Sequence, residues 1–305
     1  MPVHSSEYHA HSVTRRQFAG GAATLAGALA LGAAPRGKDR WQIGCYTRPW
    51  DQFDYRVALD GMAEAGYKYA GLMTHKSDKS WVIVTTDVSE EEAAAMGEEV
   101  RKRGMQTISI YAGNFPVQKS VDAGIDGLKK LIDNCAAVRC PNLLLGGTGK
   151  AELVTAYYKV VAECCNYAAA KKVSLSVKPH GGSNATGAQC RKIVEMVGHK
   201  NFGIWYDPGN IFYYSDGKAD PVDDVPSVDG LIAGMSIKDF KPPKEVLVTP
   251  GTGKVNFREV FARARKGGFK RGPLVVECLD RGADAATITR EARKARRMLE
   301  ELIAG

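Results

Sequence analysis

Several features that mark common functional classes are missing from this chain of 305 residues. The number of cysteines, seven, is odd, and neither a C-x-x-C pair nor a Cys/His zinc spacing occurs, so no disulfide framework or zinc finger is indicated. No Gly-rich G-x-G-x-x-G turn follows the first predicted strand, which argues against a dinucleotide-binding open sheet. The net charge is +8, but the basic residues are scattered, which favours a solvated surface over a nucleic-acid patch.

Long hydrophobic runs are also lacking. The apolar run from Ala19 to Ala34 has about sixteen residues, short of the ~20 that a membrane-spanning helix needs, so no stable span is expected. It follows Thr14-Arg15-Arg16-Gln17-Phe18, which resembles the twin-arginine export signal. We therefore predict that residues 1–40 are a twin-arginine signal peptide with a short linker, and that the protein is exported to the periplasm or the outside. An uncleaved amphipathic anchor is the alternative.

The remaining residues, 41–305, alternate between short apolar strands and helices, as expected of one α/β domain. Strands are predicted at 41–46, 69–74, 105–111, 142–145, 173–177, 202–206, 232–237 and 273–276. Helices are predicted at 55–65, 89–104, 121–138, 151–170, 188–198, 257–266 and 285–303, with a weak one at 225–231. Eight such units favour a single closed (β/α)8 TIM barrel over an open doubly wound sheet.

Polar side chains follow most of the predicted strands. They are Tyr46 and Arg48, His75 and Lys76, Tyr111 and Asn114, Lys178 and His180, Asp207 and Asn210, Lys238 and Asp239, and Glu277. In a parallel barrel the carboxyl ends of all strands meet at one face. We therefore expect these side chains to converge on a ligand site at that face.

Five segments carry a resemblance to a known family. They are K-P-H-G-G from Lys178, D-P-G-N from Asp207, S-I-K-D-F from Ser236, G-T-G-K-V-N-F from Gly251, and V-V-E-C around Glu277. From residue 42 to 303 the chain resembles the xylose-isomerase-like TIM barrels. That superfamily includes sugar phosphate isomerases, ketose 3-epimerases and the AP endonuclease family 2 type. The resemblance implies a small-molecule carbohydrate as the ligand.

The resemblance also implies one divalent metal (Mn, Mg, Co or Zn), held by a Glu, an Asp, a His and a Glu on strands five to eight. Asp207 and Glu277 match two of these positions, whereas Lys178 and Ser236 stand at the other two. Two interpretations remain open. A metal binds through Asp207, Glu277 and His180 with water, or the Lys178 ammonium takes the metal's place and pairs with both acids. We favour the second.

The reaction that the resemblance implies is proton abstraction next to a carbonyl, leading to isomerisation, epimerisation or elimination. Glu277 is then the candidate base, His180 the partner acid and Lys178 the cation that stabilises the enolate. The candidates for substrate binding are Arg48, His75, Asn210, Lys238 and Asp239. The alternatives are a non-catalytic or metal-free sugar-binding barrel and a keto-glycoside lyase.

A nucleic-acid substrate is argued against by the scarcity of histidine. The endonuclease branch of the superfamily uses several histidines, including a D-x-x-H after strand six, where this chain has Asp207-Pro208-Gly209-Asn210. Removal of the signal peptide leaves only three of the six histidines, namely His75, His180 and His199. We therefore expect no nucleic-acid partner, and the sequence does not indicate an oligomeric state.

Overall fold

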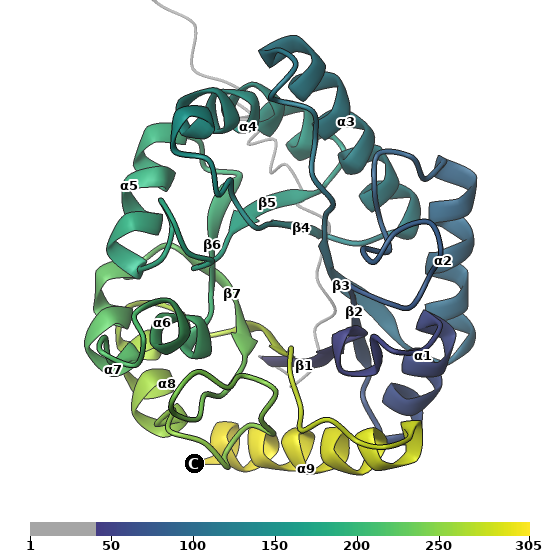
Figure 1. Ribbon diagram of the computed structural model, residues 1–305, viewed down its shortest axis with the longest axis vertical. Helices are drawn as coiled ribbons and strands as arrows, with labels where there is room; N and C mark the ends of the chain where they lie inside the picture. The colour runs from purple at the N-terminus through teal and green to yellow at the C-terminus, as the bar shows by residue number, and fades with distance from the viewer. Residues whose placement is uncertain (1–40) are drawn as a thin grey trace, which may run out of the picture. The chain divides into compact units, whose positions relative to one another are not determined.

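A computed structural model of the chain describes residues 41–305, so the predicted signal peptide and linker lie outside the described residues. The strands form a closed parallel barrel in chain order, with β1 paired to both β2 and β8, which confirms the predicted fold (Figure 1). The strands are β1 (Trp41–Tyr46), β2 (Tyr69–Leu72), β3 (Gln106–Tyr111), β4 (Asn142–Leu145), β5 (Ser174–Val177), β6 (Phe202–Tyr206), β7 (Ile232–Ile237) and β8 (Gly272–Val276).

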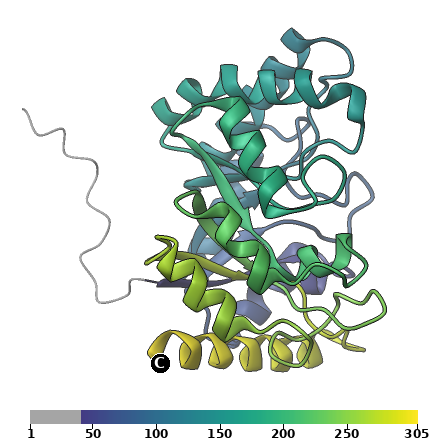
Figure 2. The ribbon, with the colours of Figure 1, turned by 90° about the vertical axis from the view of Figure 1, so that its left-hand side faces the viewer.

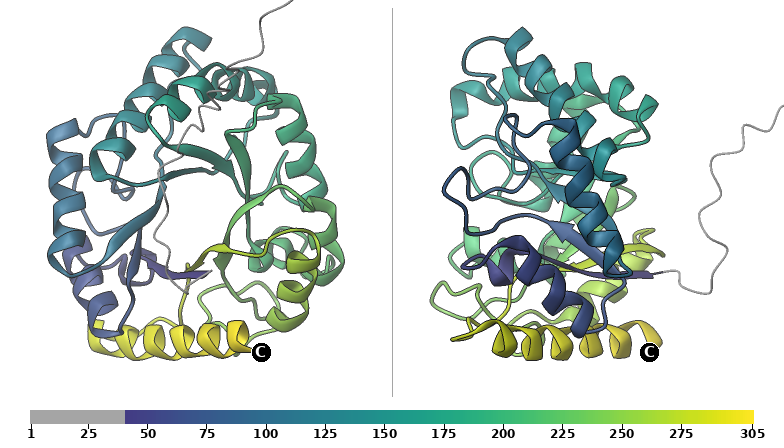
Figure 3. Two further views of the ribbon diagram at one scale, coloured as in Figure 1. Left: turned by 180° about the vertical axis from the view of Figure 1, so that it is seen from behind. Right: turned by 90° about the vertical axis from the view of Figure 1, so that its right-hand side faces the viewer.

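Helices surround this ring of strands (Figures 1 and 3). They are α1 (Tyr55–Glu64), α2 (Glu90–Lys102), α3 (Val121–Val138), α4 (Val154–Ala170), α5 (Gly187–Val197), α6 (Pro208–Tyr214), α7 (Pro221–Asp224), α8 (Phe257–Lys266) and α9 (Ala285–Ala304). The helix α9 packs against α1 and β1 where the barrel closes. Seen from the side, the C-terminus lies towards the end at which the strands begin (Figure 2).

The helix starts follow from capping side chains in the sequence. Ser89 and Thr186 each form a complete capping box, with Glu92 and Gln189 respectively, at the starts of α2 and α5. The Asp284 side chain accepts a hydrogen bond from the Thr287 backbone N–H and begins α9. Because these caps can be read from the sequence, the predicted starts of these helices lie close to the observed ones.

The connection from β6 to β7 differs from its prediction. Instead of one weak helix at 225–231, it contains α6, α7 and a 3-10 turn at Val225–Val228. The D-P-G-N segment begins α6: Asp207 is the N-cap, and its Oδ1 accepts from the Asn210 backbone N–H at 2.9 Å. Proline suits the next position because its missing N–H has no partner there anyway. The cap fixes the Asp207 carboxylate at the end of β6.

The barrel interior holds two large aromatic side chains beneath the carboxyl end. Tyr46 and Trp205 are fully buried, and each lies against a glycine of a neighbouring strand. A Cβ at Gly71 would come within 2.2 Å of the Tyr46 ring, and one at Gly234 within 2.3 Å of the Trp205 ring. The two glycines therefore make the room that the rings need.

The seven cysteines are buried and free, as expected of apolar core residues. Within residues 41–305, no helix combines the length and the apolar character required to cross a membrane.

Candidate functional site

Four charged side chains meet at the carboxyl ends of the last four strands. Lys178, Asp207, Lys238 and Glu277 come directly after β5, β6, β7 and β8, and each of their side chains is at most 3% exposed. Burying charges is unfavourable unless each one is paired. The arrangement is therefore stable only if these four side chains pair with one another. We call these four residues the ion cluster.

Lys178 joins the two acids. Its Nζ lies 2.6 Å from Glu277 Oε2 and 2.9 Å from Asp207 Oδ2. The same carboxylate oxygen of Glu277 accepts a hydrogen bond from the Ser236 hydroxyl at 2.6 Å. Thus the two residues that stand at expected metal-ligand positions, Lys178 and Ser236, both donate to Glu277.

Lys238 is the second cation of the ion cluster. Its Nζ lies 2.6 Å from Glu277 Oε1 and 3.3 Å from Asp207 Oδ2, and it donates to Asn210 Oδ1 at 3.0 Å. The sequence placed Lys238 at this face but did not identify it as a partner of the two acids. The Asn210 amide also donates to the Pro179 carbonyl at 2.6 Å, which ties α6 to the end of β5.

The electrostatics of Glu277 follow from these contacts. Burial alone would raise its pKa, but the charges of Lys178, Lys238 and Arg48 outweigh burial and hold the pKa well below its usual value. Conversely, burial opposes the charge of Lys238, and the two carboxylates overcome it and raise the pKa of Lys238. Both groups are therefore charged at neutral pH. A carboxylate held in this way is a weak base.

His180 lies beside the ion cluster, between two tyrosines. Its ring centroid is 6.2 Å from that of Tyr111 and 5.7 Å from that of Tyr214. Burial, followed by the positive charges of Lys178 and Lys238, lowers the pKa of His180 to about 3. The imidazole is therefore neutral at physiological pH; its lone pair can accept a proton, but so low a pKa makes it a weak base until a negative charge forms beside it.

Asp239 has a structural role in the following loop. It is fully buried, and its carboxylate accepts hydrogen bonds from the backbone N–H groups of Phe240, Gly251, Gly253 and Val255 at 2.8–3.0 Å. These four bonds organise the loop between β7 and α8. Asp239 is thus engaged with its own loop rather than directed to a ligand, contrary to its predicted role in substrate binding.

The two remaining candidates follow neighbouring strands but make different contacts. Arg48 follows β1, and its Nη1 lies 3.6 Å from Glu277 Oε1, at the edge of the ion cluster. His75 follows β2 and packs against the Tyr55 ring at 5.9 Å, where burial lowers its pKa and Asp54 opposes the shift. Arg48 therefore belongs to the site, whereas His75 contacts Tyr55 of α1 and, through its backbone, Trp81 of its own loop.

The residues present do not fit a divalent metal. Within the described range 41–305, no group of three or more His, Cys, Asp or Glu side chains is suited to hold a metal ion. Both carboxylates of the proposed ligand set, Asp207 and Glu277, face ammonium groups at hydrogen-bond distance. A divalent cation between them would meet Lys178 and Lys238 as like charges in a poorly solvated place.

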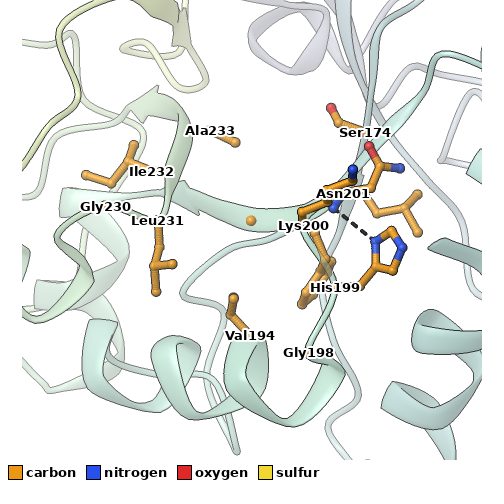
Figure 4. A pocket seen from close by; sticks show the side chains of 13 residues that line it. Ser174, Val194, Gly198, His199, Lys200, Asn201, Gly230, Leu231, Ile232 and Ala233 are labelled. Atoms are coloured by element: carbon orange, nitrogen blue, oxygen red, sulfur yellow. Dashed lines mark hydrogen bonds between the residues drawn. The ribbon is translucent and has the colours of Figure 1, made fainter. Parts of the chain in front are cut away.

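Two pockets bear on where a ligand binds. A pocket of about 250 Å³ is lined by residues after β3 and β4, including Asn114, Thr148 and Tyr157, on the side of the ion cluster. A larger one of about 470 Å³ lies where β5, β6 and β7 begin, at the opposite end (Figure 4). There the Asn201 backbone N–H donates to His199 Nδ1 at 3.0 Å. In TIM barrels chemistry belongs to the carboxyl end, so we assign the site to the ion cluster.

Comparisons with known proteins agree with this architecture. D-psicose 3-epimerase from Clostridium cellulolyticum H10, solved with D-tagatose, has a TM-score of 0.68 and 14% identity, over 86% of this chain and 99% of that one. D-allulose 3-epimerase from Methylomonas sp., solved with D-allulose, has a TM-score of 0.68 and 16% identity, over 86% and 97%. A xylose isomerase domain protein from Planctomyces limnophilus has a TM-score of 0.65 and 18% identity, over 86% and 97%.

No curated protein matches the sequence significantly. The sequence does match a family profile described as "Xylose isomerase-like TIM barrel" over residues 59–302, which is most of the chain. Together with the closed eight-stranded barrel, this match shows that the chain belongs to the xylose isomerase-like TIM barrel family.

Proposed function

We propose that this protein is an exported sugar isomerase or epimerase-like enzyme that moves a proton next to a carbonyl group, with lysine ammonium groups in the place of a metal. The observation that carries the proposal is the contact of Lys178 Nζ with both Glu277 and Asp207 at 2.6 and 2.9 Å. The psicose and allulose 3-epimerases, which share this fold, were solved with ketoses, and that supports a keto-sugar as the substrate.

The two ammonium groups supply the electrostatic part of the reaction. A carbonyl oxygen that reaches Lys178 and Lys238 becomes polarised, and the enolate formed from it is stabilised by both charges. The site excludes water, because all four side chains of the ion cluster are buried, and low polarity strengthens these interactions. Glu277 and Asp207 hold the cations in place.

His180 is the proposed proton acceptor. When the C–H bond next to the carbonyl breaks, the proton moves to the neutral imidazole, and the electron pair passes to the carbonyl oxygen as an enolate. The enolate charge offsets the charge that the imidazole gains, so the net charge of the site does not change. Return of the proton to the former carbonyl carbon, with transfer of the neighbouring hydroxyl proton to the enolate oxygen, gives an isomer. An epimer forms when a water molecule or a second acid delivers a proton to the original carbon from the opposite face.

Proton exchange with solvent tests this reaction directly. Protein purified without a chelator is incubated with ketoses in D₂O, before and after treatment with EDTA, and loss of the signal next to the carbonyl is followed by ¹H NMR. We expect exchange that survives EDTA and is lost in Lys178→Met and His180→Gln. The control is Lys200→Met, which removes an exposed lysine at the opposite end.

Two results would contradict the proposal. Absence of exchange with every ketose would favour the alternative, a non-catalytic sugar-binding barrel. Exchange that EDTA abolishes and Mn²⁺ restores would show that a metal, rather than the ammonium groups, stabilises the enolate.

Export by the twin-arginine route is part of the same proposal. It rests on Thr14-Arg15-Arg16-Gln17-Phe18, which lies outside the described residues. Replacing both Arg15 and Arg16 with Lys should retain the protein in the cytoplasm, as shown by fractionation of the producing cells. Unchanged export of this double variant would refute the assignment.

A further inference from the structure

The ion cluster and Arg48 together carry one more positive than negative charge. Lys178 and Lys238 balance Asp207 and Glu277, and Arg48 adds a third cation at the edge of the same group. An unbalanced charge in a largely buried site is unfavourable, so a ligand that brings one negative charge would stabilise it.

Other groups near Arg48 do not supply that charge. Asp51 makes no ion pair with Arg48 within the described part of the chain, and it lies half-buried at the end of the turn that Arg48 begins. Cys278 also lies close, but burial raises the pKa of its thiol, so it stays neutral.

Most N–H donors of the Arg48 guanidinium have no partner in the described residues. Its one ion pair among residues 41–305 is the 3.6 Å contact with Glu277 Oε1, an oxygen that Lys238 already approaches at 2.6 Å. Its Nε is buried, and within the same residues it has no hydrogen-bond partner. A buried N–H without a partner costs free energy that a bound acceptor would recover.

The position of Arg48 suits ligand binding. Its side chain is 24% exposed, unlike those of the ion cluster, so it reaches the mouth of the barrel. The preceding residue, Thr47, is fully buried, and its hydroxyl accepts the Met73 backbone N–H at 3.0 Å. The following turn ends at the fully buried Trp50. Arg48 therefore projects from a fixed backbone with free donors.

We infer that the substrate carries a carboxylate, which the Arg48 guanidinium binds while the carbonyl lies against the ion cluster. This inference rests on the function proposed above and specifies its substrate class as a keto-sugar acid. A guanidinium binds a carboxylate through two parallel hydrogen bonds. One carboxylate matches the single excess positive charge, whereas a phosphate monoester brings about 1.5 to 2 negative charges.

A set of three matched ligands tests the inference. D-fructose, D-fructuronate and D-fructose 6-phosphate differ only at carbon 6, and their dissociation constants are measured by calorimetry. We expect the wild-type protein to bind fructuronate about tenfold or more tightly than fructose, and more tightly than the phosphate ester. Equal or tighter binding of fructose, or tightest binding of the phosphate, would overturn the inference.

Two variants test whether Arg48 causes the preference for fructuronate over fructose. Arg48→Gln should reduce the ratio between the fructuronate and fructose affinities to near one. Lys76→Gln removes a cation from the exposed loop after β2 and should leave that ratio within about twofold of the wild type. A preference that persists in Arg48→Gln would place the carboxylate elsewhere and refute the assignment.

The same ligands separate this inference from the proposed function. Deuterium exchange is recorded for each of them in D₂O. If fructuronate binds with the expected preference but no ligand exchanges its proton, the carboxylate site stands and the catalytic proposal fails. If fructose exchanges and fructuronate has no advantage in binding, the catalytic proposal stands and the carboxylate site fails.

Discussion

The two ends of the barrel differ in what their polar residues do. At the carboxyl end, four buried charged side chains contact one another. At the amino end, the 470 Å³ pocket is lined by apolar side chains, backbone and polar residues such as Ser174, His199 and Asn201 (Figure 4). The larger pocket thus has fewer side chains that could take part in a reaction. The function proposed above relies on the buried charge and not on the larger cavity.

The reason is energetic. A buried ion pair contributes little net stability compared with well-packed apolar residues, because desolvation offsets the attraction between the charges. A barrel that needed only to fold would be served equally well by apolar side chains at these strand ends. Net stability alone therefore does not account for the ion cluster. Exchanging single residues at each end measures how strongly the buried charges depend on one another.

The largest expected effect is at the carboxyl end. Lys178→Met leaves Asp207 and Glu277 with one fewer cation in a buried place, which should lower the free energy of unfolding by about 3 to 5 kcal/mol. The matched exchange at the other end, Lys200→Met, should change it by less than about 0.5 kcal/mol because Lys200 is exposed. Urea denaturation measures both. Equal losses in the free energy of unfolding for the two variants would mean that the charges of the ion cluster do not stabilise one another.

A smaller effect is expected in the barrel wall between the two ends. Gly234→Ala places a Cβ within 2.3 Å of the Trp205 ring and should cost about 1 to 3 kcal/mol through overpacking. The control is Gly149→Ala in the loop after β4, where an added Cβ meets nothing within 4 Å in the described structure. Thermal unfolding of the two variants should separate them by several degrees, and coincident transitions would refute the close contact.

The pH dependence of stability distinguishes the buried histidine of the carboxyl end. Because the folded pKa of His180 is lowered to about 3, the unfolded chain binds a proton below about pH 6.5 that the folded protein does not. The stabilising contribution of the neutral imidazole is therefore present above that pH and is lost as the pH falls. Between about pH 7.5 and pH 5, this should cost about 1 to 2 kcal/mol.

The measurement is urea denaturation of the wild type and His180→Gln at several pH values. The variant should lose the part of the pH dependence that lies between about pH 6.5 and pH 5. Glu277 also contributes to acid sensitivity, since its pKa is lowered, but that contribution is lost only below its ordinary value of about 4.3. Parallel curves for both proteins would contradict a lowered pKa for His180.

The smallest effect concerns a polar layer beneath the ion cluster. The Tyr46 hydroxyl donates to Ser109 Oγ at 2.8 Å, and Ser109 donates to Asn142 Oδ1 at 3.1 Å. Tyr46→Phe removes the first bond and keeps the ring, so it should cost about 1 kcal/mol. Calorimetric unfolding checks this value. A loss above about 3 kcal/mol would mean that the hydroxyl also supports the ion cluster above it.

The fold was largely predictable, because strands covered on both faces are continuous apolar runs and the helices carry local caps. Among the missed elements, α6 begins with Asp207-Pro208, an N-cap followed by proline. We interpreted this pair only as the polar end of a strand. This pair is a local signal for the start of a helix, so α6 could have been predicted from the sequence.

The pairing of Lys178 with Asp207 and Glu277 was predictable from the sequence, but the pairing of Lys238 with the same two acids was not. Lys238 and Asp239 are neighbours in sequence and were both predicted to bind the substrate, yet neighbours at a strand end point to different sides. Lys238 joins the ion cluster, and Asp239 turns to the loop that contains Gly251 and Gly253. The contact of Arg48 with Glu277 joins the start and end of the described chain, and only barrel closure brings these residues together.

Titration with Mn²⁺ tests most directly whether lysine stands where a metal would bind. Protein purified without a chelator is titrated at micromolar concentration, and free Mn²⁺ is followed by electron paramagnetic resonance. Because the Lys178 ammonium contacts both Asp207 and Glu277, we expect no stoichiometric binding. Uptake of about one Mn²⁺ per chain, reduced in Asp207→Asn and Glu277→Gln, would contradict the replacement of the metal by lysine.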